Sequence, residues 1–166
     1  MAAEIERVFL LRAVPDPLPA GEVWRIDQGY LPVADGDAGS LDGRLRRIEH
    51  ADGRVEFVHT LKRGLGLVRE EVERRIDAAT FEREWPRTEG MRLRKVRTRI
   101  TEGDRVWEID RFLDLPVALA ECELPAVDAP LTIPPWLAPY IEREVTEEPA
   151  FRNSALARRA GFFDGQ

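Results

Sequence analysis

Several residue types that would anchor particular functions are scarce in this sequence. The 166 residues include a single cysteine, Cys122, which excludes an intrachain disulfide and any zinc site built on several cysteines. The two histidines, His50 and His59, have no neighbouring cluster of metal ligands, so we interpret both as structural or exposed. No apolar run is long enough to span a bilayer, and the chain enters Glu4 and Glu6 without an apolar signal region. We therefore expect a cytoplasmic protein.

Positive charge is also in deficit. The chain has 25 lysines and arginines against 31 acidic residues, a net charge of -6, which argues against a general nucleic-acid-binding surface. The basic residues are nevertheless grouped, so a local anion site stays open. The segment Gly64-Leu65-Gly66 does not match a phosphate-binding loop, and the chain has no G-x-S-x-G elbow. The length and the 43% hydrophobic content suit one domain over residues 1–166.

Most of the sequence consists of short segments in which apolar and polar residues alternate, separated by residues typical of turns. We predict strands over 4–11, 22–33, 43–50, 54–61, 67–76, 91–100, 105–112 and 117–124. Turns are expected at 35–39, at Asp52-Gly53 and at 102–104, and a loop is expected at Gly64 and Gly66. Asp77 or Thr80 is expected to cap a short helix that runs to Trp85, and helical spacing returns over 136–144 and 153–160. Hairpins with few helices predict an antiparallel barrel or sandwich.

Most of these strands carry charge on one face and apolar residues on the other. Residues i and i+2 of a strand share a face, so Glu4 and Glu6 point the same way, as do Glu121 and Glu123. The basic strand faces follow the same rule, with Arg44 and Arg46 as one example. Any one such face is most simply explained as solvated, but their repetition on nearly every strand favours a shared charged site. The period alone does not decide whether these faces point inward or outward.

These segments together resemble the CYTH domain, the family also called triphosphate tunnel metalloenzymes, and its short bacterial members above all. The resemblance begins with Glu4-Ile5-Glu6-Arg7 and runs through most of the chain in the family's order. The segments that carry it further are Gln28-Gly29-Tyr30-Leu31, Arg44-Leu45-Arg46, Thr60-Leu61-Lys62, Arg69-Glu70-Glu71-Val72-Glu73, Lys95-Val96-Arg97, Trp107-Glu108-Ile109-Asp110, Glu121-Cys122-Glu123, Val145-Thr146-Glu147 and Phe151-Arg152-Asn153.

The resemblance implies a mainly β fold, a closed eight-stranded antiparallel β-barrel tunnel with inward charges and a few flanking helices. It implies metal-dependent hydrolysis of a triphosphate, most often inorganic tripolyphosphate to pyrophosphate and phosphate, with Mg²⁺ or Mn²⁺. The implied catalytic residues are Glu4, Glu6, Lys62, Arg69 and Lys95. The implied phosphate ligands are Arg44, Arg46, Lys62, Arg69, Lys95 and Arg97. The implied metal ligands are Glu4, Glu6, Glu71, Glu73, Glu108, Asp110, Glu121 and Glu123. We expect a small triphosphate as partner, with no nucleic acid and no membrane, and homodimerisation stays open.

Two departures from the family pattern keep other functions open. Val8 stands where the Glu-x-Glu-x-Lys motif has its lysine, and Asp42-Gly43 precedes Arg44 where a glutamate and an apolar residue are usual. One alternative is therefore a polyphosphate- or nucleotide-binding module with weakened catalysis. The other is a class IV type adenylate cyclase acting on ATP, for which the sequence offers no recognisable base pocket.

Overall fold

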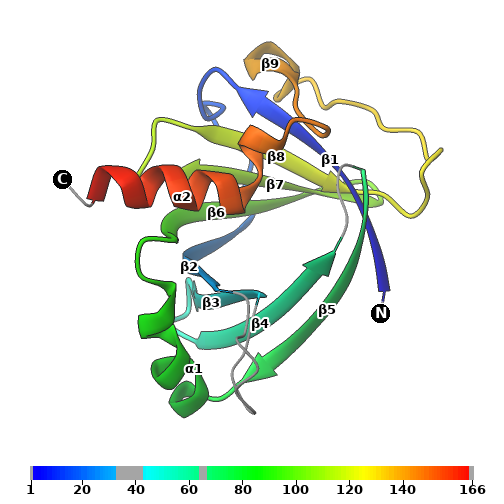
Figure 1. The fold of residues 1–166 in the computed structure, drawn as a ribbon. Helices are drawn as coiled ribbons and strands as arrows, with labels where there is room; N and C mark the ends of the chain where they lie inside the picture. The colour runs from blue at the N-terminus through cyan, green and yellow to red at the C-terminus, as the bar shows by residue number, and fades with distance from the viewer. Residues whose placement is uncertain (1, 33–42, 64–66, 165–166) are drawn as a thin grey trace.

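The computed structural model describes residues 2–32, 43–63 and 67–164. The turn predicted at 35–39 and the loop predicted at Gly64 and Gly66 lie outside these residues. All strands of the described residues belong to one antiparallel sheet (Figure 1). They are β1 Ala2–Leu11, β2 Glu22–Leu31, β3 Gly43–His50, β4 Val55–Arg63, β5 Val68–Ile76, β6 Arg92–Glu102, β7 Arg105–Phe112, β8 Ala118–Glu123 and β9 Ile141–Glu144.

The sheet closes on itself and forms the predicted eight-stranded barrel. Its order is β5-β4-β3-β2-β6-β7-β8-β1-β9, and β5 also pairs with β1 in a register that places Glu4 opposite Arg69. Because the barrel closes, the backbone donors and acceptors of β1 find strand partners on both sides. Closure also removes the open edges that an antiparallel sheet would otherwise expose. In Figure 1 the strands β6, β7, β8 and β1 form the upper wall of the barrel, and β3, β4 and β5 form the lower wall.

Two hairpins and one helix form where the turn chemistry predicted them. Gly53 and Gly103 take positive φ values of 89° and 60° in the β3–β4 and β6–β7 turns, a region that glycine enters without steric cost. The helix α1 spans Ala78–Glu84, and its cap is Asp77, whose Oδ1 accepts a hydrogen bond from Thr80 N at 2.8 Å. It continues into the 3-10 helix η1, Trp85–Thr88, and lies against the outside of the lower wall (Figure 1).

The helix predicted over 136–144 is wrong. A 3-10 helix, η2 Ala138–Tyr140, leads into β9, which pairs with β1 through Leu10 opposite Arg143 and Phe9 opposite Glu144. Pro139 lacks the N–H that a continuing helix needs, and the edge of β1 beyond β5 offers strand partners instead. After a last 3-10 helix, η3 Pro149–Phe151, the predicted C-terminal helix forms as α2, Asn153–Asp164.

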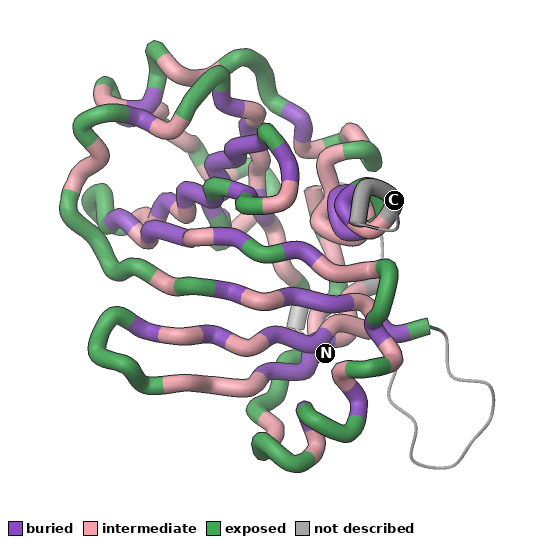
Figure 2. The backbone as a smooth tube through the Cα atoms, turned by 90° about the vertical axis from the view of Figure 1, so that its left-hand side faces the viewer, coloured by how far each residue is buried: buried purple, intermediate pink, exposed green. Residues whose placement is uncertain are grey.

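The apolar strand faces point outward and are covered by loops more than by helices. Trp107, Ile109 and Cys122 are buried outside the barrel with Phe9, and Leu18, Leu131 and Trp136 of the connecting segments pack on them. A second cluster lies beneath α2 on the inward strand faces: Leu156, Ala157 and Ala160 pack on Leu93 and Leu119, which share their faces with the cavity-lining Lys95 and Glu121. Figure 2 shows buried and partly exposed residues alternating along the strands, as two-faced strands require. None of the helices within the described ranges is long and apolar enough to cross a membrane.

Candidate functional site: a charged cavity inside the barrel

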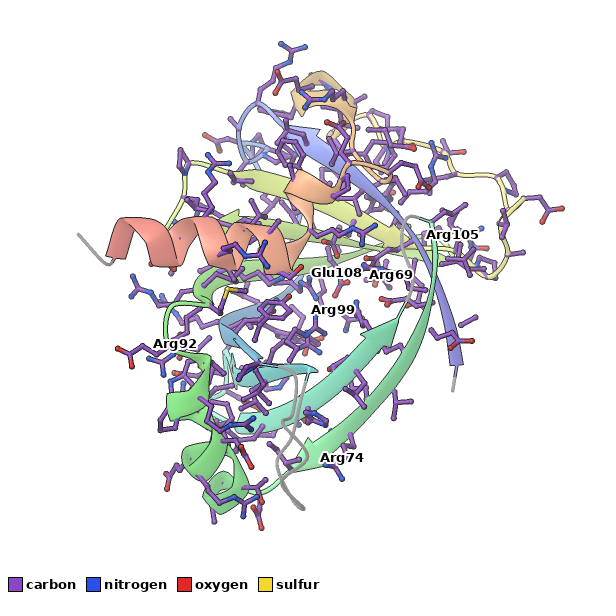
Figure 3. All side chains as sticks on the ribbon, viewed as in Figure 1. Arg69, Arg74, Arg92, Arg99, Arg105 and Glu108 are labelled. Carbon is purple, nitrogen blue, oxygen red and sulfur yellow. The ribbon has the colours of Figure 1, made fainter. Side chains whose placement is uncertain are left out.

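The charged strand faces point inward and meet inside the barrel. The two-residue alternation of the sequence did not decide between the inward and the outward direction. They line a cavity of about 470 Å³ to which β1 to β8 each contribute. Figure 3 shows Arg69, Arg99 and Glu108 directed into the space between the two walls, whereas Arg74 lies on the outer side of β5. The cavity walls bring together both signs of charge: cations come mainly from β3, β4 and β6, and carboxylates come from β1, β5, β7 and β8.

A carboxyl pair at the junction of β1 and β5, Glu4 and Glu71, contacts Lys62. The Lys62 Nζ lies 2.9 Å from Glu4 Oε2 and 3.7 Å from Glu71 Oε2. Burial and the hydrogen-bonded Glu4 raise the pKa of Glu71 to about 8. Burial alone would raise the pKa of Glu4 too, but the hydrogen bond with Glu71 and the charge of Lys62 outweigh it and lower that pKa to about 2. The pKa values of the two carboxyls are thus shifted in opposite directions, as expected for two acids that interact at hydrogen-bond distance.

A second group of carboxylates lies beside Arg69, where β1 meets β8. Arg69 Nη2 donates to Glu6 Oε1 at 2.7 Å, and Glu6 stands opposite Glu123 in the strand register. Burial and the nearby Glu6 raise the pKa of Glu121 to about 7, and burial and Glu4 raise the pKa of Glu123. Carboxyls whose pKa values are raised by crowding are poised to lose protons to a bound cation.

The cations of β3 form a third group with the β4 and β5 side chains. Arg46 Nη2 donates to Glu73 Oε2 at 3.1 Å, and Arg44 Nη2 donates to Thr60 Oγ1 at 3.4 Å. Burial and the neighbouring Arg44 lower the pKa of Arg46, although a guanidinium stays charged at neutral pH. The Nε atoms of Arg44 and Arg46 are both buried without a hydrogen-bond partner among the described residues. Two unpaired guanidinium donors facing one cavity are suited to an anionic ligand.

Lys95 and Arg97 of β6 are held from behind by Asp110. The two Asp110 oxygens accept hydrogen bonds from Arg97 Nε at 2.7 Å and Nη2 at 2.9 Å, and Oδ2 lies 2.9 Å from Lys95 Nζ. Asp110 is fully buried; burial would raise its pKa, but Arg97 and Lys95 outweigh that effect and lower it. Burial lowers the pKa of Lys95 to about 8 despite Asp110. Asp110 thus fixes the positions of two cations that do reach the cavity.

The donor set fits a small, hard divalent ion shared with a phosphate ligand. All candidate ligands are carboxylate oxygens, which Mg²⁺ and Mn²⁺ prefer. In the described part of the chain no three histidine, cysteine or acidic side chains form a complete ligand cluster by themselves. Mg²⁺ commonly uses one or two carboxylates with waters and substrate phosphates, so an incomplete protein shell is compatible with that ion.

The resemblance implies fourteen acidic and basic site residues, and all but Asp110 line the cavity. These thirteen are Glu4, Glu6, Arg44, Arg46, Lys62, Arg69, Glu71, Glu73, Lys95, Arg97, Glu108, Glu121 and Glu123. Asp110 lies behind this wall and is not among the described lining residues. Its predicted role as a metal ligand therefore stays a prediction, and the structure gives it two cationic partners instead.

The structure also adds polar groups that were not among the implied site residues. Asn153 accepts a hydrogen bond from Lys95 Nζ at 2.7 Å and another from Gln28 Nε2 at 3.2 Å, both at Oδ1. Arg99 also lines the cavity, and its Nε lies 3.2 Å from Glu108 Oε2. For Asn153 the available signal was its place in the C-terminal Phe-Arg-Asn motif, and for Arg99 it was the shared face with Lys95 and Arg97.

Comparisons with known proteins agree with this architecture. The chain is 38% identical over 161 residues to the inorganic triphosphatase of Nitrosomonas europaea, covering 93% of this chain and 96% of that protein. The crystal structure of the inorganic triphosphatase NE1496 matches with a TM-score of 0.61 and 33% identity over 93% of this chain and 97% of that one.

A more distant solved structure shares the fold alone. The PH1819 protein from Pyrococcus horikoshii OT3 has a TM-score of 0.55 and 17% identity, covering 75% of this chain and 80% of that one. No family model matches the sequence.

Proposed function

The chain belongs to the family of the Nitrosomonas europaea inorganic triphosphatase, and from this membership we propose that it hydrolyses a triphosphate, with inorganic tripolyphosphate as substrate and pyrophosphate and phosphate as products. The observation that carries the proposal is the cavity itself, where Arg44, Arg46, Lys62, Arg69 and Arg97 face a group of carboxyls inside a closed barrel. Phosphoryl transfer depends mainly on positioning and on neutralising charge, and this cavity supplies both.

Each group of cations has a distinct task in the proposed reaction. The forked guanidinium groups of Arg44, Arg46 and Arg97 bind non-bridging oxygens, and Lys62 and Arg69 neutralise charge at the terminal phosphate. Water attacks the terminal phosphorus in line, and a carboxylate of the β1 pair, Glu4 or Glu6, orients it and accepts its proton. The bridging oxygen leaves on the shorter phosphate with Lys95 beside it.

A divalent metal ion completes the proposed site. Glu4, Glu6, Glu71, Glu73, Glu108, Glu121 and Glu123 are the candidate ligands, with Mg²⁺ or Mn²⁺ as the ion. When bound, such an ion neutralises phosphate charge and orients the substrate. We further propose, from the sequence resemblance, that the chain is a CYTH-type domain that acts in the cytoplasm on a small substrate, without nucleic acid or membrane.

Product analysis tests the proposal. Phosphorus NMR of a reaction with tripolyphosphate and Mg²⁺ is expected to show pyrophosphate and phosphate in equal amounts. With ATP as substrate, ADP and phosphate support hydrolysis, whereas cyclic AMP and pyrophosphate would establish the adenylate cyclase alternative. Folded protein that releases no product from either compound would overturn the proposed hydrolysis.

Val8 favours a second candidate, a binding module with weakened catalysis. Its side chain lines the cavity two residues beyond Glu6 on the same strand face, where the family motif has a lysine. The variant Val8→Lys restores that cation. A gain in kcat of roughly a hundredfold, the effect of one charge-stabilising donor, would identify a decayed enzyme. An unchanged kcat would show that Lys62 and Lys95 already suffice.

A further inference from the structure

A row of four inward residues crosses four neighbouring strands of the barrel. Val8 of β1 is opposite Glu121 of β8, Glu121 is opposite Glu108 of β7, and Glu108 is opposite Arg99 of β6. All four line the cavity. Directly opposed residues of an antiparallel pair lie on the same face of the sheet. The row therefore has a carboxylate pair in its middle, an apolar residue at one end and a cation at the other.

The carboxylate pair in the middle of the row needs more positive charge than Arg97 supplies. Like charges that stand directly opposite on a sheet repel each other. Arg97 contacts both carboxylates, at 3.1 Å from Glu108 Oε2 and at 3.5 Å from Glu121 Oε2. The same guanidinium also donates to both oxygens of Asp110, and Lys95 contacts Asp110 as well. Two cations of β6 are thus shared among three carboxylates, so a further cation is expected beside the pair.

Val8 supplies no charge at the β1 end of the row. The motif that the chain resembles has a lysine at this position, which stands directly opposite Glu121. The valine side chain instead packs with the apolar cluster beneath α2. An apolar group gives a carboxylate neither a hydrogen bond nor an opposite charge. The β1 flank of the pair therefore lacks the cation that the motif provides at this position.

Arg99 supplies a cation at the other end of the row. Its Nε donates to Glu108 Oε2 at 3.2 Å, and Figure 3 shows both side chains in the space between the two walls of the barrel. The Arg99 guanidinium lies over the ring of Trp24, 4.8 Å from the ring centroid, and its Nη1 lies 3.6 Å from Glu22 Oε2. Glu22 also accepts a hydrogen bond from Trp24 Nε1 at 2.7 Å. Two residues of β2 thus hold Arg99 beside the carboxylate pair.

Arg99 retains a hydrogen-bond donor for a ligand. Among the residues that the structure describes, none accepts a hydrogen bond from its Nη2, and the side chain is 33% accessible. Stacking on an aromatic face leaves the N–H groups at the edge of a guanidinium able to bond in its plane. Arginine forms charge-assisted hydrogen bonds with phosphate oxygens. One guanidinium can therefore offset Glu108 and contact a phosphate oxygen at the same time.

We propose that Arg99 replaces the cation missing at Val8 and contacts a phosphate oxygen of the triphosphate in the cavity. It offsets Glu108 and Glu121 from the β6 flank, whereas a lysine at position 8 would offset them from the β1 flank. The two positions are three strands apart, about 14 Å along the curved sheet, and the carboxylates lie between them. This inference rests on the proposed triphosphate hydrolysis and adds a substrate-contacting residue to those that the resemblance implies.

Moving the charge from one end of the row to the other tests the replacement. Arg99→Gln removes the cation, so kcat/KM for tripolyphosphate with Mg²⁺ is expected to fall roughly tenfold or more, the effect of one hydrogen bond to a charged group. Val8→Lys added to Arg99→Gln places a cation on the opposite flank and is expected to recover most of that loss. In the unaltered protein the same Val8→Lys change should raise kcat/KM clearly less. Equal gains in the two backgrounds would contradict the replacement.

The recovery separates a role in the reaction from a role in folding alone. A lysine at position 8 does not restore the contacts of Arg99 with Trp24 and Glu22, so a purely structural residue would not be rescued from there. Arg99→Lys is a second variant that keeps the charge, and we expect it to retain more kcat/KM than Arg99→Gln. Loss in Arg99→Gln without recovery by Val8→Lys would overturn the replacement.

Arg111→Gln is the matched control. Arg111 is exposed on β7 and is not among the described cavity-lining residues, so its loss removes one positive charge outside the cavity. Its kcat/KM is expected to equal that of the unaltered protein. The gain from Val8→Lys in this background should match the gain in the unaltered protein. A gain as large as that in Arg99→Gln would show a general effect of charge and would contradict the assignment to Arg99.

The two levels of proposal fail separately. If the unaltered protein and Arg99→Gln hydrolyse tripolyphosphate equally well, the proposed hydrolysis stands and the role of Arg99 is wrong. If the unaltered protein hydrolyses no triphosphate, the proposed function fails. Calorimetric titration of tripolyphosphate into the metal-free protein then still tests Arg99, because Kd is expected to rise roughly tenfold in Arg99→Gln and to recover with Val8→Lys. Equal Kd values in the three proteins would overturn the inference.

Discussion

Both carboxylate oxygens of Asp110 are occupied by the guanidinium of Arg97, at 2.7 Å to Nε and 2.9 Å to Nη2. This bidentate contact is buried, and Lys95 adds a third cationic nitrogen at 2.9 Å from Oδ2. A charge placed in a barrel interior without a partner is costly, so Asp110 makes it possible for β6 to present two cations to the cavity. The position of these cations thus depends on a residue behind the cavity wall.

The variant Asp110→Asn tests that dependence. Removing one partner of a buried ion pair leaves uncompensated charge, so we expect the free energy of unfolding to fall by about 3 kcal/mol in urea denaturation. Glu49→Gln is the matched control, because Glu49 pairs with Arg47 on the exposed side of β3, where the side chains are 42% and 36% accessible. That change is expected to cost less than about 1 kcal/mol. Equal losses in both variants would contradict the structural role.

Lys62 is predicted to contribute to turnover more than to folding. The variant Lys62→Met keeps most of the aliphatic stem but removes the ammonium between Glu4 and Glu71. Losing one group that stabilises transition-state charge is expected to lower kcat for tripolyphosphate roughly a hundredfold. The control is Arg47→Met on the exposed strand face, for which kcat should not change. A Lys62→Met enzyme with undiminished kcat would remove Lys62 from the proposed mechanism.

Metal binding is predicted to stabilise the protein and to release protons. Ion binding to the folded state raises the melting temperature by mass action, and at one hundred times Kd the gain is about 2.7 kcal/mol. Because the pKa of Glu71 is about 8 in the metal-free protein, its proton must leave when an ion takes the site at pH 7.5. Calorimetry in buffers of different ionisation enthalpy should report about one proton released, and less in Glu71→Gln. An unchanged melting temperature in millimolar Mg²⁺ and Mn²⁺ would count against the site.

The stability of the metal-free protein is predicted to decline as pH rises from 5 toward 8. The pKa of Glu71 is raised from 4.5 to about 8 and that of Glu121 from 4.5 to about 7, so the folded state holds protons that the unfolded state has already lost. Unfolding then releases protons, and higher pH favours it. Melting curves in chelator across this range provide the measurement. In Glu71→Gln the decline should be shallower. A rise in the stability of the unaltered protein over the same pH range would contradict the raised pKa values of Glu71 and Glu121.

The sequence predicts the barrel strands well because their alternation is local. Each strand from β1 to β8 carries its own two-faced pattern, and the Asp-Gly and Gly-Asp turns fix the hairpins that join neighbours. The strand β9 has no such pattern, since Ile141 is its only apolar residue. Its pairing with Leu10 and Leu11 is a tertiary effect that overrides the helical spacing of 136–144.

The residues that line the cavity were predictable by type and strand face, but their partners were not. The opposite pKa shifts of Glu4 and Glu71 depend on a register between strands that lie far apart in the sequence. The position of Asp110 behind the cavity wall depends likewise on how β6 and β7 twist around the barrel, although its face on β7 was read correctly. The Phe-Arg-Asn motif marks Asn153 in the sequence, but its hydrogen bond with Lys95 forms only when α2 packs against the barrel.

The most direct test of the central claim is phosphate release from inorganic tripolyphosphate at alkaline pH, measured with Mg²⁺, with Mn²⁺ and with chelator. We predict release with at least one of the metal ions and none in chelator, with the protein folded throughout. Folded protein that releases no phosphate with either ion, or that releases it equally well in chelator, would contradict a metal-dependent triphosphatase.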